Sequence, residues 1–82
     1  MHTRFAQNLQ PPMYLRNFRR AAQTRRFSIT DTASSGWEVR EEQNSRVVRI
    51  VRYDDWHRVE RALLHFAREA VTLRENGWIE AN

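Results

Sequence analysis

Apolar residues recur every three or four positions in the C-terminal third of the chain, and this spacing constrains the fold more than any other feature. The series is Trp56, Val59, Leu63, Phe66, Ala70 and Leu73. Because an α-helix turns by about 100° per residue, these side chains share one face. Asp54 or Asp55 can cap the first turn, and Gly77 can end the helix with Trp78 folded back on its last turn. The pattern predicts a helix over residues 55–76.

Upstream of this helix, three segments have the alternating pattern of β-strands. Phe27 and Ile29 alternate with polar residues, and Trp37 and Val39 do so after the turn-forming DTASSG. After a second turn, EQNS, the segment RVVRIVRY is rich in β-branched residues. An open sheet of this size needs a cover for one face, and the long helix can supply it. We therefore expect an α+β domain at residues 27–82, with a three-stranded antiparallel β-meander packed on one long C-terminal helix.

The register of the second and third strands follows from reading EQNS as a four-residue loop. Pairing Glu41 with Arg46 places Val39 opposite Val48 and joins apolar to apolar residues across the strands. The face expected to meet the helix then holds Phe27, Ile29, Trp37, Val39, Val48 and Ile50. The opposite face is expected to hold Arg40, Val47, Arg49, Val51 and Tyr53.

Residues 1–26 are predicted to form a basic arm. They contain six arginines and no acidic residue, whereas residues 27–82 contain eight arginines and ten acidic residues, a net charge of −2. The segment PPMYLRNFRRAAQ predicts a short helix over 13–23, because proline is tolerated in the first turn of a helix. Its shared apolar side would be Met13, Leu15, Phe18 and Ala22. Residues 1–10 are expected to be disordered.

Cationic side chains follow the polar side of the predicted C-terminal helix in a line formed by Arg58, Arg61, His65 and Arg68. Every one of the fourteen basic residues is arginine, whose planar guanidinium binds phosphate and base edges. The arm and the line together indicate a small non-catalytic module that binds nucleic acid weakly and without sequence preference. The expected contacts are Arg16, Arg19, Arg20, Arg25, Arg26, Arg58, Arg61 and Arg68. Alternatively, the same arginines bind no partner and simply lie in solvent, on a tail and on the outer face of a helix.

Apolar surface left over from this arrangement indicates self-association as a second interpretation. The apolar arc of the helix spans about 200°, which is wider than one sheet face requires. Either the N-terminal helix or a second copy of the chain could cover the surplus. The second interpretation is thus a homodimeric protein–protein interaction module or small subunit without a nucleic-acid role. Its expected interface residues are Val47, Val51, Tyr53, Leu64 and Val71.

Patterns typical of catalysis or metal binding are missing from the sequence. There is no cysteine, and His57 and His65 are eight residues apart rather than the four of a helical metal pair. No glycine-rich loop is present to hold a nucleotide phosphate. We therefore expect no enzyme activity, no metal, no cofactor and no small-molecule substrate. No apolar run approaches the roughly 18 residues of a membrane-spanning helix, so we expect a cytoplasmic protein without a membrane partner.

The segment from Phe27 to Trp78 resembles the WGR domain, a small module found beside poly-ADP-ribosylating and other DNA-linked domains. The matching residues are Phe27, Trp37 within WEVRE, Tyr53, Ala62 and the closing Gly77-Trp78, where that family has Gly-Tyr. The resemblance implies a nucleic-acid-associated role. The chain reads EQNS after WEVRE and lacks the Trp-Gly-Arg triplet, so no functional residue is carried over from the family.

Overall fold

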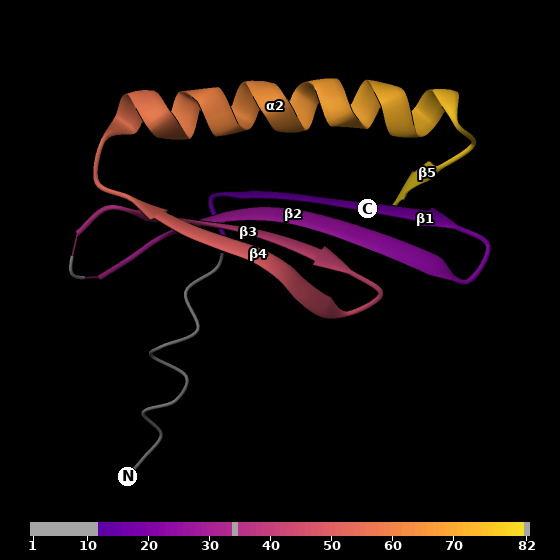
Figure 1. The fold of residues 1–82 in the computed structure, drawn as a ribbon, viewed down its shortest axis with the longest axis horizontal. Helices are drawn as coiled ribbons and strands as arrows, with labels where there is room; N and C mark the ends of the chain where they lie inside the picture. The colour runs from indigo at the N-terminus through magenta and orange to yellow at the C-terminus, as the bar shows by residue number, and fades with distance from the viewer. Residues whose placement is uncertain (1–11, 34, 82) are drawn as a thin grey trace, which may run out of the picture.

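A computed structural model describes residues 12–33 and 35–81 of the 82-residue chain. Their elements are β1 (Tyr14–Arg20), β2 (Gln23–Asp31), β3 (Trp37–Gln43), β4 (Arg46–Tyr53), α2 (Trp56–Glu75) and β5 (Ile79–Ala81). The strands form one antiparallel sheet in the order β4-β3-β2-β1-β5, and α2 lies across one of its faces (Figure 1). The fold is therefore α+β, as predicted, with a larger sheet than the predicted meander. The expected disorder of residues 1–10 falls outside the described residues.

The segment expected to form an N-terminal helix and arm instead forms β1 and the start of β2. Tyr14 and Phe18 both point toward α2, and Tyr14 stacks on Phe66 with ring centroids 5.8 Å apart. The predicted helix over 13–23 is wrong. A spacing of four residues puts Tyr14 and Phe18 on one face of either a helix or a strand. The strand satisfies its backbone by pairing with β2, whereas a helix this short gains little stability by itself.

The predicted register of β3 and β4 is also wrong. The connecting turn has two residues, Asn44 and Ser45, with φ of 53° and 67°, as in the tight turns that suit β-hairpins. A bulge between Glu41 and Glu42 shifts the pairing further, so that Val39 lies opposite Val51 rather than Val48. The displacement is three residues, and an odd displacement exchanges the two faces of a strand.

This exchange reverses the predicted environments of β4 beyond the bulge, whereas Val47 stays on the face turned away from α2, as predicted. Val51 and Tyr53 lie on the helix-facing side, contrary to prediction, and both are half-buried. Val48 and Ile50 were expected in the core, but their side chains are 52% and 47% exposed. The apolar residues of β4 that remain near the surface are thus a different set from the predicted one.

The core lies between the sheet and α2 and is built around stacked aromatic rings. Phe27 of β2 stacks on Phe66 of α2 with centroids 4.7 Å apart, and Trp37 meets Trp56 edge-on at 5.1 Å. The buried apolar side chains are Phe18, Phe27, Ile29, Val39, Val59, Phe66, Ala70 and Leu73. Val59, Phe66, Ala70 and Leu73 confirm the predicted apolar stripe at these four positions, whereas Leu63 is partly buried and Trp56 is 39% exposed.

Both ends of α2 are capped as the sequence predicts. The carboxylate of Asp55 accepts a hydrogen bond from the backbone N–H of His57 at 2.9 Å. At the other end Gly77 adopts a φ of 89°, and the N–H of Trp78 donates to the carbonyl of Leu73 at 2.9 Å. Trp78 therefore folds back on the last turn, and the chain continues directly into β5.

The short strand β5 completes the sheet beside β1, an element that the sequence pattern did not predict. Its pairing joins Phe18 to Glu80 and Arg19 to Ile79.

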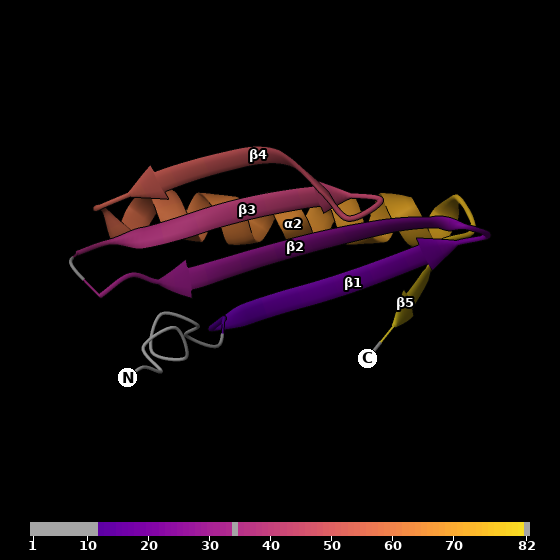
Figure 2. The same cartoon turned by 90° about the horizontal axis from the view of Figure 1, so that it is seen from below.

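Figure 2 looks onto the face of the sheet turned away from α2, where Leu15, Val47 and Ile50 are about half exposed. Within the described residues, no helix is long and apolar enough to cross a membrane.

Candidate functional site

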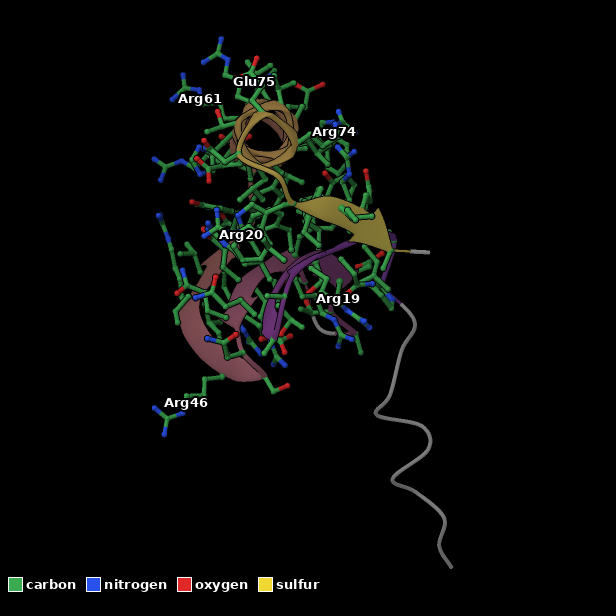
Figure 3. The ribbon with its side chains drawn as sticks, turned by 90° about the vertical axis from the view of Figure 1, so that its right-hand side faces the viewer. Arg19, Arg20, Arg46, Arg61, Arg74 and Glu75 are labelled. Carbon is green, nitrogen blue, oxygen red and sulfur yellow. The ribbon has the colours of Figure 1, made fainter. Side chains whose placement is uncertain are left out.

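The cationic line of α2 lies along the flank of the helix that faces β3 and β4. Arg58, Arg61 and His65 follow one another at helical spacing, and all three line a groove beside the sheet. Figure 3 shows Arg61 and Arg74 leaving α2 on opposite sides, Arg61 on the side of β4 and Arg74 on the side of β5. Arg68 continues the line on the surface but does not line the groove. The predicted line is thus one wall of a concave site.

The opposite wall of the groove comes from the sheet. Arg49 of β4 and Glu41 of β3 are cross-strand neighbours on the helix-facing side, and both line the groove. Neither was predicted as a site residue, because the predicted register turned Arg49 away from the helix and paired Glu41 with Arg46. A two-residue turn at Asn44-Ser45 moves the predicted register by two residues and changes no face, so it is the bulge between Glu41 and Glu42 that turns Arg49 toward α2.

The groove has a volume of about 460 Å³ and an apolar floor below a charged rim. Its floor contains Val39, Val51, Tyr53, Ala62 and Phe66, and its rim contains Glu41, Arg49, Arg58, Arg61 and His65. Small-ligand pockets of about 300–1,000 Å³ combine an apolar lining with a few polar groups in the same way. The groove therefore has the size and lining of a site for a small organic group.

The electrostatics of the groove favour an anion. Three arginines and one glutamate give the rim a net charge of +2 with His65 neutral. Arg49, Arg58 and Arg61 form no ion pair with a carboxylate in the described part of the chain. Concave surfaces lined by one sign of charge concentrate the field that attracts a partner of the opposite sign. Phosphate and carboxylate groups both fit the geometry of a guanidinium.

Arg16, one of the predicted contacts in the N-terminal segment, is held by contacts within the fold. It donates two hydrogen bonds to the carboxylate of Glu80, at 2.8 and 2.7 Å. These hydrogen bonds lower the pKa of Glu80 below its usual range, and they raise the pKa of Arg16. The pair joins β1 to β5 and leaves little of Arg16 available to a ligand.

Arg20 and Arg25 are also held by contacts within the fold. The guanidinium of Arg20 lies 5.0 Å from the ring centroid of Trp78 and donates to the carbonyl of Asn76 at the end of α2 (Figure 3). The guanidinium of Arg25 lies 5.4 Å from the ring centroid of Phe27 and 3.7 Å from the carboxylate of Glu69. Cation–π contacts and ion pairs of this kind stabilise the packing of α2 on the sheet.

Arg19 and Arg26 are exposed on the face of the sheet turned away from α2, where Arg26 donates to the side-chain carbonyl of Asn17 at 2.8 Å. The arginines predicted as nucleic-acid contacts therefore do not form one surface. Arg58 and Arg61 gather with Arg49 in the groove, while Arg19 and Arg26 lie on the opposite side of the sheet.

The predicted interface residues are divided between two surfaces as well. Val51 and Tyr53 line the groove, whereas Val47 lies on the opposite face of the sheet and is about half exposed. Leu64 and Val71 are 52% and 49% exposed on α2. These five residues do not form one continuous patch.

No protein-family model, curated protein or solved structure matches this chain. The resemblance to the WGR domain stays a prediction. The interpretation of the groove therefore depends on its own residues.

In the described ranges, no three histidine or acidic side chains come together as possible ligands of a metal ion.

Proposed function

We propose that this protein is a small non-catalytic module that binds single-stranded nucleic acid in the groove between α2 and β4. The observation that carries the proposal is the placement of Arg49, Arg58 and Arg61 around an apolar and aromatic floor. Proteins that bind single strands combine cations that follow the phosphates with aromatic surfaces that bases contact. The groove offers both in one place.

The dimensions of the groove favour a single strand over a duplex. A base in a duplex is stacked and paired, so it cannot enter a groove of about 460 Å³ without being extruded. A single strand can place one base against Tyr53 while its phosphates meet the rim. Arg68 lies further along the same flank and can contact the next phosphate.

A salt titration tests this proposal directly. The fluorescence anisotropy of a labelled ten-nucleotide uridine strand is measured with the protein at salt concentrations between about 50 and 200 mM. Counterion release makes the logarithm of the binding constant fall with the logarithm of salt by about 0.7 for each phosphate contacted on a single strand. With three groove arginines we expect a slope of about −2, and a duplex probe should bind more weakly.

Single variants separate the groove from the general positive charge of the chain. Arg49→Ala, Arg58→Ala and Arg61→Ala should each remove about one phosphate contact and flatten the slope by about 0.7. Arg74→Ala is the matched control, because it removes the same charge from the opposite side of α2 (Figure 3). Equal effects of Arg74→Ala and Arg61→Ala would contradict a localised site. No binding at 50 mM salt would end the proposal.

A homodimeric interaction module is the second candidate, and it is favoured by the exposure of Leu64 and Val71 on α2. The two residues are one heptad apart, so they lie on the same side of the helix. Sedimentation equilibrium at micromolar concentration should then give twice the 9.9 kDa mass of the chain. Leu64→Glu should restore the monomer, and a wild-type monomer would exclude this candidate.

A further inference from the structure

Glu41 is an unusual residue for a site that only binds phosphate. Among the residues that the structure describes, its carboxylate is the single negative group on the rim of the groove, and it would repel a phosphate placed beside it. The side chain is half-buried on the helix-facing side of β3. Within residues 12–33 and 35–81, it makes no side-chain hydrogen bond and no ion pair. Its two oxygens are therefore available to accept hydrogen bonds from a ligand.

An ionised carboxylate only accepts hydrogen bonds, so it selects a partner with donors. Among the four common bases, guanine alone presents two adjacent donors on its Watson–Crick edge, at N1 and the 2-amino group. Adenine and cytosine present one amino group beside an acceptor nitrogen, and uracil presents one N–H between two carbonyls. Only guanine can pair with both oxygens of a carboxylate.

Arg49 is placed to complement the other edge of the same base. It lies opposite Glu41 across β3 and β4, on the same face of the sheet. Side chains of directly opposed residues begin about 4.5–5.5 Å apart. In guanine, O6 and N7 are acceptors next to the Watson–Crick edge, and an arginine binds them with two parallel hydrogen bonds. Glu41 and Arg49 thus match neighbouring edges of a single guanine.

We propose that the groove accepts one guanine base of a single strand. Glu41 accepts from N1–H and the 2-amino group, Arg49 donates to O6 and N7, and the base lies against Tyr53. Arg58 and Arg61 on α2 then contact the adjoining phosphates. This inference rests on the proposed function and adds a base preference to it, in contrast to the sequence-independent binding that composition alone indicates.

The test compares ten-nucleotide uridine strands that carry one central guanine, adenine or cytosine, since a single guanine avoids four-stranded structures. A well-made bidentate contact discriminates between bases by roughly one to two orders of magnitude. We expect the guanine strand to bind about tenfold more tightly than the other strands. Replacing guanine by inosine removes the 2-amino donor, and 7-deazaguanine removes the N7 acceptor. Each replacement should lose part of the preference.

Variants of the protein test whether Glu41 contributes to the guanine preference. Glu41→Gln replaces one acceptor oxygen by a donor amide, and it should reduce the guanine preference to the part that Arg49 supplies while leaving binding of the all-uridine strand equal or slightly stronger. Glu75→Gln is the matched control, because it removes the same charge from an exposed position on α2 (Figure 3). Circular dichroism of both variants should match the wild type.

The outcomes distinguish the two proposals. Equal, salt-dependent binding of all four strands would overturn the guanine pocket and leave the proposed function in place. A guanine preference that is undiminished in Glu41→Gln would overturn the assignment to Glu41. Binding of none of the strands at low salt would overturn both proposals.

Discussion

Replacing Gly36 by alanine should damage the fold through a single added carbon. Gly36 has a φ of 82°, a conformation that disfavours residues with a Cβ atom. A Cβ built on it would lie 2.3 Å from the carbonyl oxygen of Tyr53 and 3.2 Å from the Cα of Asp54. These neighbours are backbone atoms at the end of β4, so relief requires a movement of the strand. Because Tyr53 also lines the groove, that movement would reach the candidate site.

The magnitude follows from two contributions. The left-handed backbone costs about 1–2 kcal/mol for a residue other than glycine, and overpacking against atoms that cannot move aside adds about 1–3 kcal/mol. The total of about 2–5 kcal/mol is a large part of the 5–15 kcal/mol that stabilises typical domains. Gly77→Ala is the matched control. Gly77 has a φ of 89°, but in the described part of the chain a Cβ there would meet only the side chain of Arg20, at 3.8 Å.

Urea denaturation of the two variants measures the difference between them. Both should lose the backbone contribution, and Gly36→Ala should lose about 1–3 kcal/mol more of the free energy of unfolding than Gly77→Ala. Equal losses would refute the close approach of the turn before β3 to the end of β4.

Three further predictions concern the core, the sheet edge and the helix start. Phe66→Ala removes the ring that stacks on Phe27 and should lower the free energy of unfolding by about 3–5 kcal/mol in urea, with a smaller loss for Phe66→Leu. Arg16 lowers the pKa of Glu80 from its usual value of 4.5, so the ion pair stabilises the fold above that pH and is lost as pH falls through the lowered pKa. The stability gap between wild type and Glu80→Gln should therefore be about 1–2 kcal/mol at neutral pH and should shrink below pH 4.5, whereas a gap independent of pH would contradict the ion pair. Asp55→Ala removes the acceptor for the N–H of His57 and should cost about 1 kcal/mol in thermal denaturation, and no loss would show that the cap is not needed.

The helix could be predicted in detail because its signals are local. Its apolar spacing, the cap at Asp55 and the ending at Gly77 each depend on a few consecutive residues. The strand β1 was missed because Met13, Leu15, Phe18 and Ala22 fit one side of a helix, and only pairing with β2 decides between helix and strand. In the strand, Tyr14 joins Phe18 on the helix-facing side, and Met13 and Leu15 are about half exposed. The strand β5 has three residues, too few for a recognisable alternation.

The candidate site could be predicted on its helical side only. Arg58 and Arg61 were recognised because helical periodicity alone places them on one flank. Arg49 was not, since the face of a strand residue depends on register, and here register depends on a turn and a bulge. Glu41 lies on the same face as Val39, but the predicted register paired it with Arg46 rather than with Arg49. Small local irregularities therefore decided which charges meet across the groove.

The pairing of β5 with β1 has a consequence for the order in which the fold assembles. The strands β1 to β4 are joined by successive hairpins, whereas Arg16 and Glu80 are 64 positions apart in the chain. Closing a long loop costs more entropy than closing a hairpin, so contacts distant in the chain form later. The meander can form first, and α2 then carries β5 to the bare edge of β1. Until that step is complete, and whenever three-residue β5 detaches, the edge of β1 can pair with a strand of another molecule.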